Sequence, residues 1–351
     1  MLINTVSPHG GDIYKNRVDI DFSANINPYG MPPEVRAALE ASLDACSAYP
    51  DPYCTKLREK IAEAENVPQS SVICGNGAAE LIYQFAYALD DARPALIVSP
   101  TFCEYEQALD AAGVRCEKYY LKESDGFRLT KEFLRVDFSR YSAVVICSPN
   151  NPTGITIERE IIESAAGSGA RMLCDFCFLD LTSDPGRYDI PSLTERHPNI
   201  FVLKAFTKSY AMAGLRLGYA VCRDGAFLER MSKKAQCWNV STPAQAAGSA
   251  AVGCREWLGR TVSMIAAERE YLARRLGALG ITVYPGEANY LMLKAREDLA
   301  RETMRRGIMI RDCSGYDGLG EGYFRIAVRT REENERLIAA VKSIMNSRDT
   351  E

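Results

Sequence analysis

The sequence has no long hydrophobic run and almost no excess of either charge. No apolar stretch in its 351 residues approaches the roughly 18 to 20 residues that a membrane-spanning helix needs. The formal net charge of −4 offers no strongly positive surface to a nucleic-acid backbone. The first residues, MLINTVSPHGGDIYKN, lack the charged and then apolar layout of a signal peptide. We therefore expect a cytoplasmic protein that binds neither a membrane nor nucleic acid.

Potential metal ligands are few or scattered. The chain has only two histidines, and its 12 cysteines are spread along its whole length. Without an export signal, we interpret these cysteines as reduced thiols that serve as small hydrophobic residues. The one close pair, Cys174 and Cys177, has no second pair or histidine near it that would complete a zinc site. The sequence thus predicts neither a metal site nor a redox site.

Short apolar runs alternate with longer amphipathic stretches in the first two thirds of the chain. Such alternation is typical of crossover connections and of a largely parallel sheet covered by helices on both faces. Ligands bind such sheets outside the carboxyl ends of the strands. We expect strands at 94–100, 141–149, 170–180, 199–206 and 216–222, and helices at 78–91 and 102–113.

The pattern changes after about residue 240. A long helical stretch (243–279) precedes several short β-like runs and a final helix, which is typical of a smaller α+β unit. We predict an N-terminal arm (1–40) that joins the small domain, a large domain (41–240) and a small C-terminal domain (241–351).

Two turns in the large domain could bind a ligand. VICGNGAAELI (72–82) places Gly75, Asn76 and Gly77 at the start of a helix, where free N–H groups and the positive helix end favour an anion. A plain tight turn would explain the same glycines. SPNNPTG (148–154) ends a predicted strand with an Asn-Pro turn, and Asn151 could either meet a ligand or cap its own loop.

Asp175 and Lys208 are harder to explain without a ligand. Asp175 lies in an apolar strand, where a carboxylate is costly unless an arginine or a protonated heterocyclic nitrogen meets it. Lys208 stands between Thr207 and Ser209, eight residues before Arg216. A free lysine has a pKa near 10.4, so it acts as a nucleophile at neutral pH only in a special environment.

An anion cradle, a strand-end Asn, a buried Asp, a Lys and then an Arg are the parts that hold pyridoxal 5'-phosphate (PLP). Lys208 would carry the cofactor, Asp175 would keep the pyridine nitrogen protonated, and Asn151 would meet the phenolic oxygen. Thr207, Arg216 and the glycine loop would bind the phosphate.

This order of motifs resembles the fold-type I PLP-dependent enzymes, and the histidinol-phosphate aminotransferase-like branch in particular. The resemblance extends from DFSANINPYGMP (21–32) to YFRIAVR (323–329). It implies an α/β aminotransferase-like fold, with a large domain built on a mostly parallel sheet and a smaller α+β domain.

The resemblance also assigns the remaining cofactor contacts. It places Gly77, Ala78 and Ala79 at the cofactor phosphate and stacks Phe102 on the ring. It implies a homodimer with shared active sites, in which Tyr49 reaches the cofactor phosphate of the neighbouring subunit.

Two positions depart from the pattern of that branch. Phe178 stands where a tyrosine is common and lacks the hydroxyl that would meet the phenolic oxygen. Ala205 likewise lacks a hydroxyl that is common three places before the lysine.

Within this branch, PHGGDIY (8–14) and the ANINPYG stretch resemble the decarboxylating group that acts on L-threonine O-3-phosphate in cobalamin biosynthesis. The resemblance implies that Arg325 binds the substrate carboxylate and that Arg311 and His9 meet the substrate phosphate, with Ser23 or Asn25 nearby and Gly10 beside His9. Two alternatives stay open. His9 could instead belong to a loose N-terminal tail, and Arg311 and Arg325 could instead form salt bridges in the small domain.

We therefore predict decarboxylation of L-threonine O-3-phosphate to (R)-1-amino-2-propanol phosphate. The alternatives are an aminotransferase for histidinol phosphate or another phosphorylated amino acid, and a protein of this fold that binds effectors without turnover.

Overall fold

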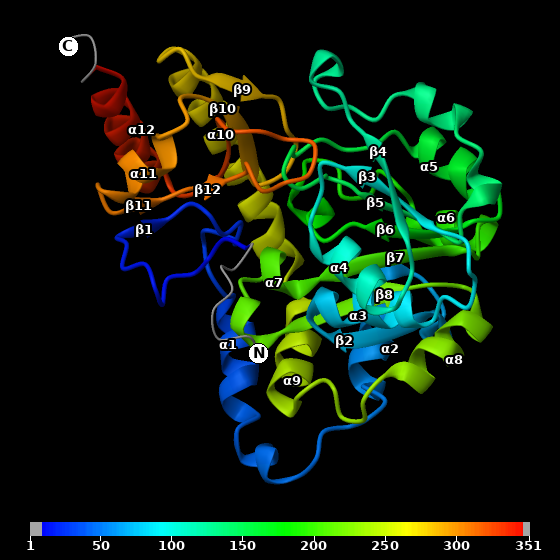
Figure 1. Ribbon diagram of the computed structural model, residues 1–351. Coiled ribbons are helices and arrows are strands. Elements are labelled where there is room, and N and C mark those ends of the chain that lie inside the picture. Colours follow the sequence, from blue (N-terminus) through cyan, green and yellow to red (C-terminus); the bar gives the residue numbers. More distant parts are fainter. Residues whose placement is uncertain (1–8, 347–351) are drawn as a thin grey trace.

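A computed structural model describes residues 9–346, and its largest feature is a seven-stranded sheet (Figure 1). β8 runs antiparallel to both of its neighbours, and the other adjacent strands are parallel. In spatial order the strands are β2 (Val72–Asn76), β8 (Leu217–Val221), β7 (Ile200–Ala205), β6 (Arg171–Asp175), β5 (Ala143–Cys147), β3 (Ala95–Ser99) and β4 (Cys116–Tyr120).

The five predicted strands are confirmed, and β2 and β4 are additional edge strands. The sequence CEKYY of β4 has no continuous apolar run, because this edge strand is only partly buried. The predicted strand 170–180 was too long, since β6 ends at Asp175. There the Cys177 N–H donates to Asp175 Oδ1 at 2.9 Å, so the chain turns instead of extending the strand.

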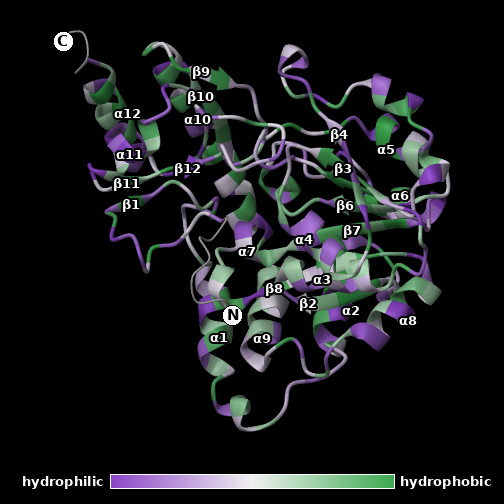
Figure 2. Ribbon diagram, viewed as in Figure 1, coloured by the Kyte–Doolittle hydropathy of each residue, from purple (hydrophilic) through white to green (hydrophobic). Residues whose placement is uncertain are grey.

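Helices cover both faces of the large sheet, whose central strands are mostly hydrophobic (Figure 2). Residues such as Leu81, Leu109 and Phe227 fill the core beneath one face, and Leu57, Ile161 and other apolar side chains fill the other. The first face carries α3 (Gly77–Tyr87), α4 (Glu104–Ala111) and α8 (Gly225–Lys234), and the second carries α2 (Thr55–Glu65), α5 (Arg159–Ala166), α6 (Ile190–Arg196) and α9 (Thr242–Ala251).

The C-terminal part of the chain forms a second, smaller body at the upper left of Figure 1. Its antiparallel sheet has the order β12 (Arg311–Asp312), β13 (Tyr323–Ala327), β10 (Tyr290–Lys294) and β9 (Thr282–Tyr284). Helices α10 (Arg255–Gly277), α11 (Leu299–Met304) and α12 (Arg331–Asn346) pack beside it. The predicted helical stretch 243–279 is therefore two helices, α9 and α10, which the turn around Gly253 separates.

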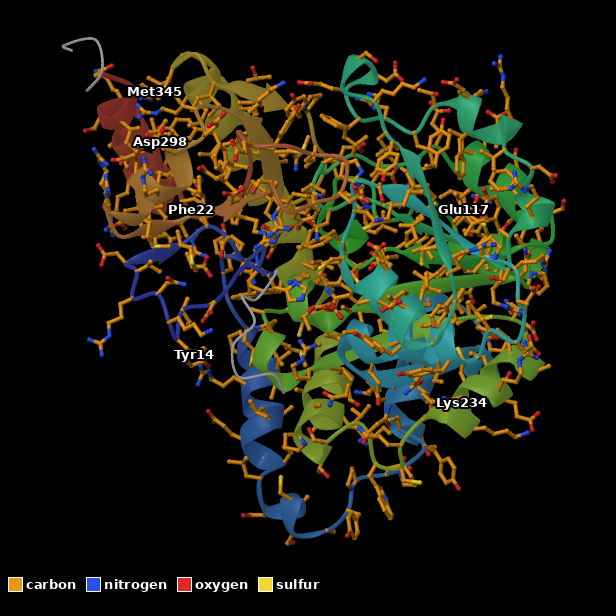
Figure 3. All side chains as sticks on the ribbon, viewed as in Figure 1. Tyr14, Phe22, Glu117, Lys234, Asp298 and Met345 are labelled. Carbon is orange, nitrogen blue, oxygen red and sulfur yellow. The ribbon has the colours of Figure 1, made fainter. Side chains whose placement is uncertain are left out.

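The N-terminal arm crosses from this small body to the large sheet. β1 (Ile20–Asp21) pairs in parallel with β11 (Ile308–Met309), and Phe22, labelled in Figure 3, is buried in the small-domain core. α1 (Pro33–Ala41) instead packs on α9, and its Val35 joins a core of the large sheet. The exact domain boundaries stay a prediction.

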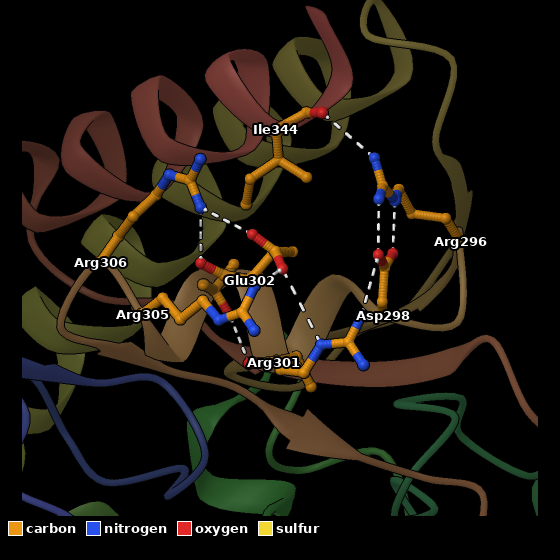
Figure 4. Close-up of polar contacts among 9 residues, drawn as sticks. Arg296, Asp298, Arg301, Glu302, Arg305, Arg306 and Ile344 are labelled. Carbon is orange, nitrogen blue, oxygen red and sulfur yellow. Dashed lines mark hydrogen bonds and ion pairs between the residues drawn. The ribbon is translucent and has the colours of Figure 1, made fainter. Parts of the chain in front are cut away.

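Two ionic networks hold elements together. On the surface of the small body, Arg296 forms a double contact with Asp298 and donates to the Ile344 carbonyl of α12 at 3.2 Å (Figure 4). Inside the large domain, the Lys204 amine of β7 lies 2.7 Å from Glu65 and 2.8 Å from Asp180. Because Lys204 is buried, removing it would leave buried carboxylates without their positive partner, which costs more stability than breaking an exposed ion pair.

In residues 9–346, no helix is both long and apolar enough to cross a bilayer.

Candidate active site

The carboxyl ends of the parallel strands open onto a cavity of about 420 Å³ that the small domain and the arm help to enclose. This is where a ligand site is expected in such a sheet. The walls include most of the residues predicted from the sequence: His9, Gly10, Ser23, Asn25, Ala78, Ala79, Phe102, Asn151, Asp175, Thr207, Lys208, Arg216 and Arg325.

Lys208 lies on the short helix α7 (Phe206–Ser209), directly after β7. Asn27 of the arm holds this helix, since its backbone N–H donates to the Lys208 carbonyl at 3.0 Å and its side chain donates to the Ser209 carbonyl at 2.7 Å. Burial, together with the positive charge of Arg325, lowers the pKa of the Lys208 amine to about 8. The neutral fraction of this amine near neutral pH is therefore minor, but far larger than that of an ordinary lysine.

Asp175, the last residue of β6, presents a buried carboxylate to the same cavity. Its Oδ2 accepts a hydrogen bond from the Tyr105 hydroxyl at 2.6 Å, and its Oδ1 accepts one from the Cys177 N–H at 2.9 Å. Burial raises the pKa of Asp175, and these two donors oppose that effect. Such a group can pair with a cationic nitrogen of a ligand.

The cradle at the start of α3 depends on close backbone approaches. Gly77 has φ +79°, and a Cβ placed there would lie 2.6 Å from Arg216 Nη2. A Cβ on Gly218 of β8 would lie 2.5 Å from the Ala78 nitrogen. Arg216 therefore reaches the first turn of α3, where helix N–H groups and a guanidinium can together bind a phosphate.

Asn151 is oriented by its neighbours. Its Oδ1 accepts hydrogen bonds from Arg325 Nη1 and from the Tyr316 hydroxyl, the latter at 3.1 Å. Arg325 Nη2 donates to the Ser23 carbonyl at 2.6 Å. Because its oxygen has two donors, the amide nitrogen of Asn151 remains for a ligand acceptor.

The N-terminal arm supplies further polar groups to the cavity wall. His9 Nε2 lies 2.7 Å from Glu104 Oε1, and this contact with His9 holds the pKa of Glu104 below its usual value. Both amide atoms of Asn25 are buried and have no hydrogen-bond partner among residues 9–346, as a ligand-binding amide would be. His9, Cys103 and Glu104 are the one group of potential metal ligands within residues 9–346.

Three predicted residues lie outside the cavity lining. Gly77 is not in the lining, but it lies close to Arg216, which is. Arg311 lines an adjoining cavity of about 80 Å³ that shares Phe102 and Tyr316 with the main one. Tyr49 is 78% exposed and stacks on Trp238 with ring centroids 4.3 Å apart, so its predicted role in a neighbouring subunit stays a prediction.

Glu104, Tyr105 and Tyr316 also line the cavity, although they were not predicted from the sequence. Tyr105 lies in the first turn of α4, three residues after Phe102, which precedes that helix. Tyr316 lies in a glycine-rich loop between Arg311 and Arg325, with the Arg311 guanidinium 5.6 Å from its ring centroid. Phe178, predicted as a departure, is in the wall and has its ring centroid 5.7 Å from Lys208 Nζ.

Comparison with known proteins agrees with this geometry. A sequence profile described as "Aminotransferase class I and II" matches residues 17–341. The chain is 37% identical to a threonine-phosphate decarboxylase of Salmonella typhimurium, over 97% of each chain. It is also 30% identical to a histidinol-phosphate aminotransferase of Methanocaldococcus jannaschii, over 93% of this chain and 89% of that one.

Solved structures show the same fold. A histidinol-phosphate aminotransferase from Clostridium acetobutylicum has a TM-score of 0.87 at 24% identity, over 93% of this chain and 99% of that one. An L-threonine-O-3-phosphate decarboxylase from Porphyromonas gingivalis has a TM-score of 0.79 at 24% identity, with the same coverage. The fold is thus the predicted aminotransferase-like fold type I, and the chain belongs to the aminotransferase class I and II family.

Proposed function

We propose that this protein is a PLP-dependent decarboxylase that acts on L-threonine O-3-phosphate. The observation that carries the proposal is the presence of Lys208, Asp175 and Arg325 in one cavity, with Arg311 beside it. This arrangement offers a covalent anchor and two cationic groups for a substrate that bears a carboxylate and a phosphate. The 37% identity to a protein named threonine-phosphate decarboxylase supports the same substrate.

The residues present fit PLP. The cradle formed by the α3 N-terminus, Thr207 and Arg216 suits its phosphate, the buried carboxylate of Asp175 suits its pyridine nitrogen, and the amide of Asn151 suits its phenolic oxygen. The contact between Gly77 and Arg216 leaves no room for a larger residue at the cradle. When bound, PLP supplies an electron sink that weakens one bond at the substrate Cα.

The chain's own residues select which bond breaks. Arg325 would bind the substrate carboxylate, and Arg311 and His9 would bind the substrate phosphate. Anchoring both ends restricts rotation about the Cα, and such orientation can contribute several kcal/mol, about 7 to 11 at best. Asn25, whose buried amide has no hydrogen-bond partner in the part of the chain that the structure describes, adds a polar contact to this positioning.

Lys208 has a second role after carbon dioxide leaves. Its amine, with a pKa of about 8, is able both to lose and to regain a proton near neutral pH. We assign it the delivery of a proton to Cα.

A single assay separates decarboxylation from transamination. The holoenzyme is given L-threonine O-3-phosphate without a keto acid. A decarboxylase releases carbon dioxide over many turnovers and retains PLP, whereas an aminotransferase stops after one turnover with the cofactor in its amine form. The second outcome would favour histidinol phosphate as substrate, in line with the relatives of that name.

A second assay tests whether the site carries the cofactor at all. PLP is added to the purified protein, the adduct is reduced with borohydride, and the digest is analysed by mass spectrometry. We expect the label on Lys208, and an unlabelled Lys208 would contradict every PLP-dependent function, including effector binding by an intact cofactor site. A homodimer in which Tyr49 completes the partner's site, and a cytoplasmic location, belong to the same proposal.

A further inference from the structure

The Asp175 carboxylate is held by a donor that comes from a different part of the chain. Tyr105 lies on α4, and its hydroxyl donates to Asp175 Oδ2 at 2.6 Å across 70 residues of sequence. The Tyr105 side chain is 1% exposed. A hydrogen bond from a buried hydroxyl to a charged acceptor is stronger than the same bond in water.

The direction of this hydrogen bond follows from the chemistry of the two groups. Burial and the nearby charge of Asp175 raise the pKa of Tyr105 well above its ordinary value, so its hydroxyl keeps its proton and acts as the donor. Burial favours the neutral form of Asp175, and the donors Tyr105 and Cys177 favour the carboxylate. The Tyr105 hydroxyl contributes the larger of the side-chain hydrogen bonds, ahead of the Cys177 thiol, and it can be removed without moving the backbone.

Tyr105 also contacts Phe102, a residue of the cavity wall. Its ring lies edge-on to that of Phe102, with centroids 5.7 Å apart and planes at 82°. Phe102 is the residue expected to stack on the ring. Tyr105, in the first turn of α4, therefore contacts both the expected stacking side chain and the carboxylate expected to meet the ring nitrogen.

We propose that Tyr105 is a positioning residue that keeps Asp175 ionised and oriented, and thereby keeps the proton on the pyridine nitrogen of the cofactor. This inference rests on the proposed function, because it concerns PLP in the same cavity. Without the Tyr105 hydroxyl, the shared proton moves toward Asp175, the ring nitrogen becomes more neutral, and the cofactor withdraws electrons less strongly from the substrate.

The test compares two variants that each remove one buried hydroxyl. Tyr105→Phe removes the donor to Asp175. Tyr188→Phe is the matched control: Tyr188 is also buried, its ring stacks on Phe176 with centroids 4.4 Å apart, and its hydroxyl bonds to Ser148 and to the Ile157 carbonyl at 2.5 and 2.6 Å. Both variants lose hydrogen bonds of a buried tyrosine hydroxyl, but only the hydroxyl of Tyr105 contacts Asp175.

Two readouts do not depend on turnover. In holoenzyme loaded with ¹⁵N-labelled PLP, the ring-nitrogen resonance of Tyr105→Phe should move toward that of unprotonated pyridine, while that of Tyr188→Phe stays at the wild-type position. In apoprotein with ¹³C-labelled aspartate, the Asp175 carboxyl should titrate at higher pH in Tyr105→Phe. The rate constant kcat should also fall about tenfold to a hundredfold, the usual effect of losing a hydrogen bond to a charged group.

The outcomes are distinguishable. If wild-type protein binds PLP and the Tyr105→Phe resonance equals that of wild type, this inference fails and the proposed function stands. If wild-type protein does not bind PLP, the proposed function fails and the ring-nitrogen part of this inference fails with it. Equal shifts in both variants would indicate a general loss of packing and would also overturn the inference.

Discussion

Gly77 and Arg216 are so close that no side chain fits between them: a Cβ on Gly77 would lie 2.6 Å from Arg216 Nη2. Gly77 begins α3, and Arg216 directly precedes β8 with φ +57°. The pairing of β2 with β8 brings these two turns together. The proposed phosphate cradle is thus made by two residues in left-handed backbone conformations.

Gly77→Ala should therefore weaken PLP binding, because the added methyl displaces Arg216. We expect the affinity to fall by about tenfold or more. It is measured by titrating apoprotein with PLP and following the visible absorbance. Gly113→Ala is the matched control, since Gly113 has φ +72° but no atom within 4 Å of an added Cβ. Both variants bear the same backbone strain, so an equal loss of affinity in both would contradict the cradle.

The low pKa of Lys208 predicts a pH-dependent stability of the apoprotein. The pKa is about 8 in the folded state and near 10.4 in an unfolded chain. Between these values the unfolded state binds more protons, so the free energy of unfolding rises with pH. Relative to Lys208→Met, wild type should gain about 2 kcal/mol between about pH 7.5 and about pH 9.5. Urea unfolding of both proteins measures this difference, and parallel pH curves would contradict it.

Tyr49 provides a test of shared active sites. If Tyr49 acts in the neighbouring subunit, Tyr49→Ala and Lys208→Ala homodimers should each be nearly inactive. Mixed and reassembled subunits should recover about a quarter of wild-type activity, because half of the dimers are mixed and each has one intact site. No recovery in verified heterodimers would show that Tyr49 acts within its own subunit, and an active Tyr49→Ala homodimer would place Tyr49 outside the active site.

Arg311 should contribute to binding of the substrate phosphate. Arg311→Gln should raise KM for L-threonine O-3-phosphate by about tenfold to a hundredfold, as expected for losing a charge-assisted hydrogen bond. PLP affinity should stay unchanged, since Arg311 lies in the adjoining cavity. Steady-state kinetics and a PLP titration of the same preparation measure both quantities, and an unchanged KM would assign the phosphate to other residues.

Replacing Lys204 should lower the free energy of unfolding. Burial raises the pKa of Glu65, but Lys204 outweighs burial and holds that pKa below its usual value. Lys204→Met leaves this carboxylate buried and unpaired, which typically costs about 3 to 5 kcal/mol. The deficit should shrink as falling pH protonates Glu65. Urea unfolding at neutral and at acidic pH measures it, and Lys122→Met, which breaks the exposed pair with Glu132 at 3.0 Å, should change little.

The chemical parts of the site were predictable because they are local features of the sequence. Asp175, Lys208 and Asn151 each lie at or just after the end of an apolar run, and parallel strands bring such ends to one edge of a sheet. The strand lengths were less predictable. Nothing in the apolar residues 176–179 shows that the chain turns after Asp175, since that turn depends on a hydrogen bond to the Asp175 side chain.

The contacts that tune these parts could not be predicted, because each joins distant segments. Tyr105 meets Asp175 across 70 residues, His9 meets Glu104 across 95, and Tyr316 meets Asn151 across 165. Side-chain types and hydrophobic spacing thus determined the fold class and which residues we propose for the chemistry. Only the tertiary structure decided the protonation and orientation of those residues, because burial and neighbouring donors depend on how the packed elements meet.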